Sequence, residues 1–152
     1  MTSRDTAHNR IEILHGVNLN TLGRRDPEQY GTFTLAELET RISRWGDELE
    51  LRTTFFQTNH EGEFCEYLHR IPDLADAAIV NAGAWTHYSW AIRDAIEVAG
   101  VPFVEVHISD VSQREDWRKD SIFEGLAVEK ISGEGAEGYR RALEIIKREL
   151  GA

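Results

Sequence analysis

The sequence predicts an α/β protein in which helices cover both faces of a doubly wound parallel sheet, and three observations support this class. Short β-type runs alternate five times with segments whose apolar residues recur at helical spacing. The run at residues 102–106 is nearly continuously apolar, as parallel strands buried on both faces are. Polar clusters follow four successive strands, at the edge where open α/β sheets bind their ligands.

Length and composition favour one domain of ordinary size. In a chain of 152 residues we expect residues 1–9 to form a disordered polar tail, without a signal peptide or anchor, and residues 10–152 to form a single α/β domain. The formal net charge of -10 disfavours nucleic-acid binding, and every apolar stretch is too short to span a membrane. The single cysteine, Cys65, is consistent with a reducing compartment, so we expect a cytoplasmic protein.

The first half of the chain alternates strand and helix signals. Strands are expected at about residues 10–15, 51–56 and 77–80. Between the first two strands, the capping-box sequence Thr34-Leu35-Ala36-Glu37 predicts the start of a helix. After the second strand, an apolar helical face from Phe64 to Ile71 predicts another helix, and Pro72 is expected to end it.

The second half begins with a helix predicted over residues 91–99 and a buried strand predicted over 102–106. The sequence Ser112-Gln113-Arg114-Glu115 then matches a second capping box. A helix starting there would place Arg114 and Arg118 four residues apart on one face. We therefore expect a short helix that presents two arginines together.

The chain closes with a weak strand signal at residues 126–128, a glycine-containing turn at 133–135 and a helix whose apolar stripe runs from Tyr139 to Leu150. Parallel strands joined by helices require right-handed crossovers. The complete pattern therefore predicts a flavodoxin-like, five-stranded parallel sheet in a three-layer α/β/α arrangement.

The loop after the first strand is the most informative stretch of the chain. Residues 16–33 show no periodicity, which is long for a strand-to-helix connection and typical of a lid over an active site. Arg24, Arg25 and Tyr30 lie within it. Cationic and phenolic groups on such a loop could close over an anion and exclude water.

Because polar clusters follow four strand ends, the fold is expected to bring nine polar residues to one edge of the sheet. They are Asn18, Arg25, Tyr30, Asn81, His87, His107, Ser109, Arg114 and Arg118. Two histidines near arginines favour acid–base chemistry, and a tyrosine beside an arginine can act as a base because the cation favours the phenolate. The alternatives are histidines that only make structural hydrogen bonds and a tyrosine that only packs in the loop.

Other kinds of site find less support. The spacing of the histidines does not match a metal site, and no cysteine lies near His87 or His107. The first turn is not the glycine fingerprint of dinucleotide-binding proteins, and no phosphate-binding loop with a lysine is present. Lys119, Lys130 and Lys147 are expected to face solvent, which gives no support for Schiff-base chemistry.

From about Ile11 to Leu150 the chain resembles the type II 3-dehydroquinate dehydratase family. The motifs are Gly16-Val17-Asn18-Leu19-Asn20, Leu22-Gly23-Arg24-Arg25-Asp26-Pro27, Tyr30-Gly31, Gln57-Thr58-Asn59-His60-Glu61-Gly62, Asn81-Ala82-Gly83-Ala84, Thr86-His87, Arg93-Asp94-Ala95, Glu105-Val106-His107-Ile108-Ser109 and Arg114-Glu115. The resemblance implies a lyase without metal, cofactor or Schiff base, which dehydrates 3-dehydroquinate to 3-dehydroshikimate by anti elimination through an enolate. That reaction serves the shikimate pathway, and hence aromatic amino acid biosynthesis, or quinate breakdown.

The resemblance also implies roles for individual residues. Tyr30 would remove a proton from C2, Asn18 would hold a water on the enolate oxygen, and His107 would protonate the departing C1 hydroxyl. Arg25, with Arg114 nearby, would favour the ionised tyrosine. The other implied residues are Asn81, His87 and Arg118 for ring hydroxyls, Ile108 and Ser109 for the carboxylate, Asp94 for a neighbouring subunit's site, and Glu105 for support. Family members form trimers grouped into a dodecamer.

Several positions depart from the family pattern without removing a named catalytic group. They are His15, Val17, Asp26, Thr58, Trp90, Asp110, the run Ile122-Phe123-Glu124-Gly125, and Glu129, Lys130 and Glu134. Asp110 would place a carboxylate near the pocket for the substrate carboxylate, and Trp90 lies beside the implied subunit interface. Two alternatives stay open: a related lyase or isomerase acting on another cyclic polyol acid, and a catalytically silent oligomeric binding protein. A nucleotide-binding domain is a more distant third.

Overall fold

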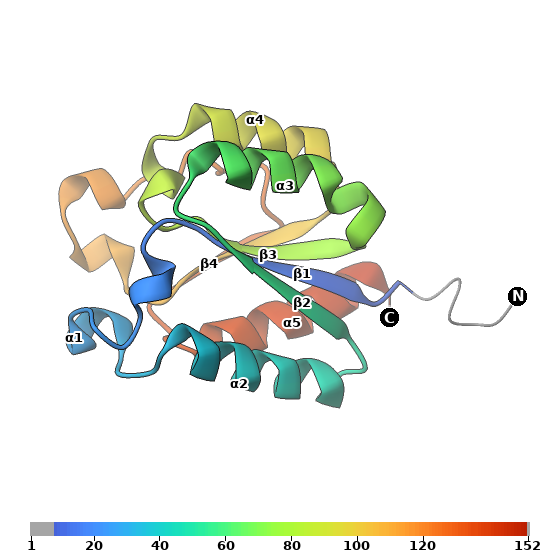
Figure 1. Cartoon of the computed structure of the whole chain (residues 1–152), viewed down its shortest axis with the longest axis horizontal. Helices are drawn as coiled ribbons and strands as arrows, with labels where there is room; N and C mark the ends of the chain where they lie inside the picture. Colours follow the sequence, from blue (N-terminus) through green and yellow to red (C-terminus); the bar gives the residue numbers. More distant parts are fainter. Residues whose placement is uncertain (1–7, 152) are drawn as a thin grey trace, which may run out of the picture.

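A parallel sheet of five strands in the order β2-β1-β3-β4-β5 forms the middle layer of the computed structural model, which describes residues 8–151 (Figure 1). The strands are β1 (Arg10–His15), β2 (Arg52–Gln57), β3 (Ala77–Asn81), β4 (Phe103–His107) and β5 (Glu129–Ser132). Every neighbouring pair is parallel. The chain places β2 on one side of β1 and then β3, β4 and β5 on the other side, as it does in flavodoxin-like folds. The predicted fold class is confirmed.

Four helices form the outer layers. They are α2 (Leu35–Glu48), α3 (Glu61–Leu74), α4 (Trp90–Ala99) and α5 (Glu137–Leu150). In Figure 1, α3 and α4 cover one face of the sheet, and α2 and α5 cover the other. The short elements are η2 (Leu19–Thr21), α1 (Pro27–Tyr30), η3 (Gly83–His87), η4 (Val111–Gln113) and η5 (Asp116–Arg118). All of them follow the carboxyl end of a strand.

Strand alternation divides the buried side chains between two cores and directs the polar residues at the strand ends. Ile13 packs in the core with α2 and α5, whereas Leu14 packs in the core with α3 and α4. Because successive side chains point to opposite faces, His15 lies on the side of Ile13. In β4, Val106 packs with α5, so His107 projects on the opposite side.

The predicted helix start at Thr34 is confirmed, but the predicted end at Pro72 is wrong. The Thr34 side chain accepts a hydrogen bond from the Glu37 N–H at 3.1 Å, and the Glu37 carboxylate accepts one from the Thr34 N–H at 2.8 Å. Helix α3 continues past Pro72 to Leu74, and the Ala75 N–H still donates to the Ile71 carbonyl. The φ angle of proline suits a helix, so near its end Pro72 removes only one hydrogen bond.

The predicted helix after Ser112 is replaced by two separate turns. Asp110 caps η4 by accepting hydrogen bonds from the Ser112 N–H at 3.0 Å and the Ser112 hydroxyl at 2.6 Å. Asp110 thereby takes the Ser112 N–H that the Glu115 side chain would accept in a capping box, and Arg114 follows in extended conformation. Arg114 and Arg118 therefore reach the carboxyl edge of the sheet from different turns.

The fifth strand begins after the apolar run that was expected to form it. Leu126 and Ala127 pack from a loop against the core of α3 and α4, and β5 comprises the next residues, Glu129–Ser132. Within β5 only Ile131 is buried. An edge strand needs one apolar residue on its inner face, so the sequence Glu-Lys-Ile-Ser carries little strand signal.

The expected tail lies mostly outside the described residues, which begin at His8. Asn9 already contacts the sheet, because its carbonyl accepts a hydrogen bond from the Arg52 N–H at 2.7 Å. Within residues 8–151, no helix is both long enough and apolar enough to cross a membrane.

Candidate active site

The loop after β1 places a tyrosine beside the sheet edge by forming a single helical turn. Asp26 accepts a hydrogen bond from the Glu28 N–H, Pro27 occupies the first helical position, and Gly31 ends the turn with a φ of 72°. Proline at this position suits a helix start, and glycine tolerates the positive φ. The turn buries Tyr30 to 8% exposure. The long loop predicted as a lid is therefore ordered into η2 and α1.

Two guanidinium groups contact Tyr30 from different directions. The Arg25 guanidinium carbon lies 3.8 Å from the centre of the phenol ring, and Arg114 Nη1 donates a hydrogen bond to the phenol oxygen at 2.8 Å. The same Arg114 nitrogen donates to the Ser109 hydroxyl at 3.1 Å. Burial lowers the pKa of Arg25, and the nearby cations Arg118 and Arg114 add to that effect. A guanidinium remains charged near neutral pH despite such a shift, so Tyr30 lies between two positive charges.

Strand β4 carries a histidine held by a buried carboxylate. His107 Nε2 and Glu105 Oε2 are 2.5 Å apart, and the Ser121 hydroxyl donates to the other oxygen of Glu105 at 2.9 Å. Both carboxylate oxygens are therefore engaged, and the Nε2–H of His107 is the donor to Glu105. No described residue bonds His107 Nδ1, which leaves this nitrogen for a ligand.

A second histidine, His87, lies beside the first. Its Nδ1–H donates to the Asp120 carbonyl at 2.7 Å, and its ring stacks on His107 with centroids 6.0 Å apart. The Trp117 ring lies nearly perpendicular to the His87 ring, with centroids 5.5 Å apart. Burial lowers the pKa of His87, and the neighbouring His107 and Arg118 add to the lowering. At neutral pH His87 is therefore uncharged, with Nε2 available as an acceptor.

Two glycines bring the ends of β1 and β3 close together. A Cβ on Gly16 would lie 2.4 Å from the Ala82 carbonyl oxygen, and a Cβ on Gly83 would lie 2.7 Å from the Val17 carbonyl oxygen. Gly83 also has a φ of +63°. The Gly83 N–H donates to Asn81 Oδ1 at 3.2 Å, which fixes the orientation of the Asn81 amide at the pocket.

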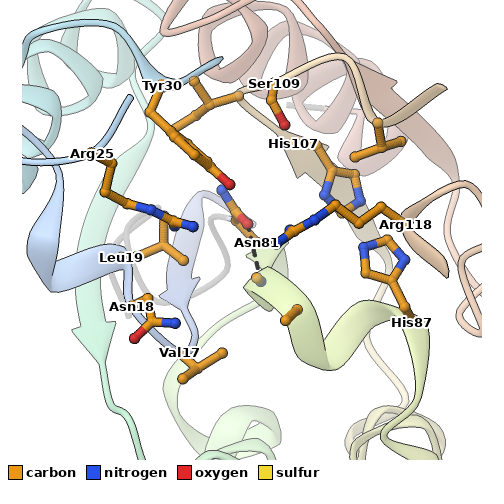
Figure 2. A pocket seen from close by; sticks show the side chains of 14 residues that line it. Val17, Asn18, Leu19, Arg25, Tyr30, Asn81, His87, His107, Ser109 and Arg118 are labelled. Atoms are coloured by element: carbon orange, nitrogen blue, oxygen red, sulfur yellow. Dashed lines mark hydrogen bonds between the residues drawn. The ribbon is translucent and has the colours of Figure 1, made fainter. Parts of the chain in front are cut away.

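These elements enclose one pocket at the carboxyl edge of the sheet (Figure 2). It is lined by Val17, Asn18, Leu19, Arg25, Tyr30, Asn81, Gly83, Ala84, His87, His107, Ile108, Ser109, Val111 and Arg118. The space between these side chains, counted together with the open solvent at its mouth, is about 470 Å³. Figure 2 shows side chains from the loop after β1 on one side of the space and His107, His87 and Arg118 on the other.

Most of the predicted site residues come together here. Nine of them line the pocket: Asn18, Arg25, Tyr30, Asn81, His87, His107, Ile108, Ser109 and Arg118. Arg114 and Glu105 do not line it but bond residues that do. Asp94 lies exposed on α4 and is not among the lining residues. Of the two adjacent arginines in the loop, Arg24 is exposed and only Arg25 reaches the pocket.

Sequence reasoning missed the residues that support the site from behind. Ser121 bonds Glu105, and Tyr139 bonds Asn81 at 3.0 Å. Tyr139 was assigned only to the apolar stripe of the last helix. The one available signal was a tyrosine hydroxyl on that stripe, since a buried hydroxyl usually has a hydrogen-bond partner.

The pocket concentrates positive charge in an acidic chain. Arg25, Arg114 and Arg118 lie at or beside it, although the whole chain has a net charge of -10. Among residues 8–151, no three His, Cys, Asp or Glu side chains are grouped so that they could hold a metal ion. The arrangement suits an oxygen-rich anion held between a phenol and an imidazole, each able to exchange a proton with it.

Comparison with known proteins gives a consistent result. The model of the family "Dehydroquinase class II" matches residues 9–147. A 3-dehydroquinate dehydratase of Pelobacter propionicus is 48% identical over 135 residues, which cover 88% of this chain and 91% of that protein. One from Thermotoga petrophila is 45% identical over 141 residues, or 93% of this chain and 96% of that protein.

Solved structures agree. The type II dehydroquinase of Propionibacterium acnes superposes with a TM-score of 0.86 at 36% identity, covering 93% of this chain and 99% of that one. That of Butyrivibrio crossotus superposes with a TM-score of 0.88 at 34% identity, covering 95% and 99%. The family model, the relatives and the structures all extend over nearly the whole chain. The chain therefore belongs to the class II dehydroquinase family.

Proposed function

We propose that this chain is a 3-dehydroquinate dehydratase, a hydro-lyase that converts 3-dehydroquinate to 3-dehydroshikimate. The observation that carries the proposal is that Tyr30, in contact with two guanidiniums, shares a small pocket with His107, whose Nδ1 is free. Relatives that cover most of the chain bear this enzyme's name. The same dehydration serves the shikimate pathway, which leads to aromatic amino acids, and quinate breakdown.

The first step is proton removal from C2, next to the C3 ketone. Tyr30 acts as the base in its phenolate form, which Arg114 and Arg25 stabilise by hydrogen bonding and charge. The electron pair moves onto the ketone oxygen and gives an enolate. Asn18, at the pocket wall, holds a water on that oxygen. A short contact between donors and a developing negative charge is usually the largest single contribution to such catalysis.

The second step expels the C1 hydroxyl. His107 gives its Nδ1 proton to the leaving oxygen, the C1–O bond breaks, and the enolate electrons form the C1=C2 double bond of the conjugated product. The Glu105 carboxylate, fixed by Ser121, accepts the Nε2–H and stabilises the imidazolium that donates the proton. After the reaction Tyr30 carries the proton from C2, and His107 has given one proton to the departing water. Both side chains return to their starting states by exchanging protons with solvent.

Substrate binding uses the remaining polar groups of the pocket. Asn81, His87 and Arg118 bind ring hydroxyls, and the Ile108 backbone with the Ser109 hydroxyl binds the carboxylate. Ser109 accepts from Arg114, so its own hydroxyl proton is available to a carboxylate oxygen. The arginines supply the charge that attracts an anionic substrate to an acidic protein.

We also propose that residues 10–152 work as one catalytic domain within a cytoplasmic homo-oligomer, in which trimers assemble to a dodecamer. Trp90, Asp94 and Val98 recur every four residues on one face of α4, and all three are exposed. We call these three residues the α4 surface. Two large apolar side chains flanking a carboxylate suit an interface through which Asp94 reaches the site of another copy. No metal or cofactor takes part in this proposal.

The decisive experiment follows turnover of 3-dehydroquinate by the ultraviolet absorption of the enone product, with EDTA present. The wild type is expected to turn over, and Tyr30→Phe to lose about three orders of magnitude in kcat while binding product nearly as before. Tyr88→Phe, which removes an exposed phenol outside the pocket, serves as the matched control and should retain full activity.

Each other outcome has a definite meaning. Full activity in Tyr30→Phe would exclude Tyr30 as the base. Stabilisation of the folded protein by 3-dehydroquinate without turnover would indicate a silent binding protein. Turnover only of another cyclic polyol acid would indicate a related lyase or isomerase.

A further inference from the structure

A buried hydrogen-bond chain runs from the pocket into the core behind it. Asn81 Nδ2 donates to the Tyr139 hydroxyl oxygen at 3.0 Å, and that oxygen lies 2.9 Å from His15 Nε2. His15 and Tyr139 have no exposed surface, and Asn81 is 4% exposed. His15 and Asn81 pair directly across β1 and β3, so their side chains project on the same face of the sheet, toward α5.

The direction of each hydrogen bond follows from counting donors. The Gly83 N–H can only donate, so the atom of Asn81 facing it is Oδ1, and the atom facing Tyr139 is the amide nitrogen. The Tyr139 oxygen therefore accepts from Asn81, and its own proton needs another acceptor. Among the described residues His15 Nε2 is the available partner.

The opposite arrangement leaves more groups unsatisfied. His15 Nδ1 is buried, and no residue between 8 and 151 forms a hydrogen bond with it. If Nε2 carried the proton, two groups would lack a partner: the Tyr139 hydroxyl proton and the Nδ1 lone pair. If Nδ1 carries the proton, one group lacks a partner, the Nδ1–H. Burial also lowers the pKa of His15 to about 3, so the ring is neutral and has one lone pair. The favoured chain is Asn81 N–H to Tyr139 oxygen, and Tyr139 O–H to His15 Nε2.

We propose that His15 is a positioning residue for substrate binding: by accepting the Tyr139 proton, it holds Asn81 so that the amide presents an N–H to the pocket. This rests on the proposed function, because Asn81 then binds a ring hydroxyl through that oxygen's lone pair. One Asn81 proton is used by Tyr139, and the second has no described partner. Asn81 lines the pocket beside Arg118 (Figure 2), so the hydroxyl between them meets donors from both sides.

Removing the acceptor at residue 15 would disturb the pocket indirectly. Without it, the buried Tyr139 O–H has no acceptor, and an unsatisfied buried donor is unfavourable. It could instead donate to Oδ1 of Asn81, the residue it already contacts, but only if the Asn81 amide turns over. Turning the Asn81 amide breaks the hydrogen bond from the Gly83 N–H to Oδ1. It also removes the Asn81 N–H from the position in which it would donate to the substrate hydroxyl.

The kinetic test compares two changes at the same position. His15→Leu keeps the approximate volume and removes the acceptor, whereas His15→Gln places Oε1 as many bonds from Cβ as Nε2 is in histidine. We expect His15→Leu to raise KM for 3-dehydroquinate roughly tenfold, which corresponds to the loss of about one hydrogen bond to the substrate. The value of kcat should change less than about threefold. His15→Gln should recover most of the wild-type KM, and Tyr139→Phe should raise KM as His15→Leu does.

A double-mutant cycle separates positioning from a general loss of packing. In an Asn81→Ala background, His15→Leu should change KM by less than about twofold, because the residue it acts through is gone. An equal rise in KM in both backgrounds, or a fall in kcat alone, would overturn the proposal. Tyr139→Phe in the same background provides a second cycle if His15→Leu does not fold.

A measurement without substrate keeps this proposal distinct from the proposed function. Nitrogen-15 NMR of histidine-labelled wild-type protein at pH 7 should show His15 protonated at Nδ1 and bare at Nε2. A proton on Nε2 would overturn the proposal even in an active enzyme. The predicted tautomer in a protein that does not turn over 3-dehydroquinate would contradict only the proposed reaction.

Discussion

At the scale of single residues, the pocket depends on side chains whose partners are fixed before any ligand arrives. Arg114 bonds Tyr30 and Ser109 at once, and Glu105 bonds His107 and Ser121 at once. A guanidinium with several donors and a carboxylate with two oxygens suit such shared contacts. Preorganised groups do not have to reorient when charge develops on the substrate, which is the main advantage of an enzyme site over water.

The buried His15 makes the stability of the protein depend on pH. Burial lowers its pKa in the folded state to about 3, against about 6.5 when exposed, and the groups around its ring, Tyr139 and Asn81, carry no charge. Between these values only the unfolded state binds the proton, so the free energy of unfolding falls as the pH falls. From pH 7 to pH 5 this one residue should account for a loss of about 2 kcal/mol.

Urea unfolding at fixed protein concentration measures this effect. His15→Gln, which does not titrate, should lose about 2 kcal/mol less than the wild type over the same pH interval. His87 titrates in both proteins, so its contribution cancels in the difference. Equal losses in the two proteins would show that His15 accepts a proton in the folded state.

At the scale of secondary-structure elements, the sequence predicted the pieces that follow periodic rules and missed those set by local competition. The capping box at Thr34 and the apolar stripe of α5 were found because helical spacing and capping chemistry are encoded within a few residues. The segment after Asp110 was mispredicted because the Asp110 carboxylate takes the Ser112 N–H that the Glu115 side chain would bind in a capping box. Nothing in the spacing of Ser112 and Glu115 reveals that competition.

The same distinction applies to the candidate site. Residues that follow strand ends, such as Tyr30 and His107, were found from their positions, and the family resemblance supplied their expected roles. The contact between Asn81 and Tyr139 joins residues 58 positions apart, and it depends on how α5 packs on the sheet. A hydrophobic stripe predicts that packing, but it does not predict which hydroxyl meets which amide.

The close approach of the chain after β1 to the chain after β3 gives a prediction at this scale. Gly16→Ala would place a methyl group 2.4 Å from the backbone oxygen of Ala82, so the two strand ends must separate. We expect a loss of about 3 kcal/mol in the free energy of unfolding and a fall in activity, because Asn81 moves with its strand. Urea unfolding and steady-state kinetics check the two effects.

Gly62→Ala is the matched control for that change. Gly62 lies in α3, and a Cβ there would contact nothing within 4 Å. Because alanine favours a helix over glycine, this variant should be neutral or more stable by about 0.5–1 kcal/mol. Equal behaviour of the two variants would show that the close approach at Gly16 does not constrain the fold.

At the scale of the whole molecule, one pocket gathers residues that lie between positions 17 and 118 of the chain. The sheet achieves this because all five strands are parallel, so every strand ends at the same edge. Asp94 is the exception, since it lies exposed on α4 rather than at that edge. In the proposed assembly, a second copy of the chain would give this residue a place in a site, so the assembly is part of the proposed mechanism.

Trp90→Asp tests that assembly. Trp90 is 64% exposed and lies one turn before Asp94, so in an interface between copies a carboxylate there would remove apolar contact and add repulsion. We expect association at least tenfold weaker, a smaller particle by analytical ultracentrifugation, and severalfold lower activity as Asp94 leaves the neighbouring site. Val128→Asp, an exposed valine beside β5, is the matched control and should leave mass and activity unchanged. A Trp90→Asp protein with the wild-type particle mass would show that the α4 surface does not bind another copy. Full activity in a dissociated protein would show that Asp94 is not needed across an interface.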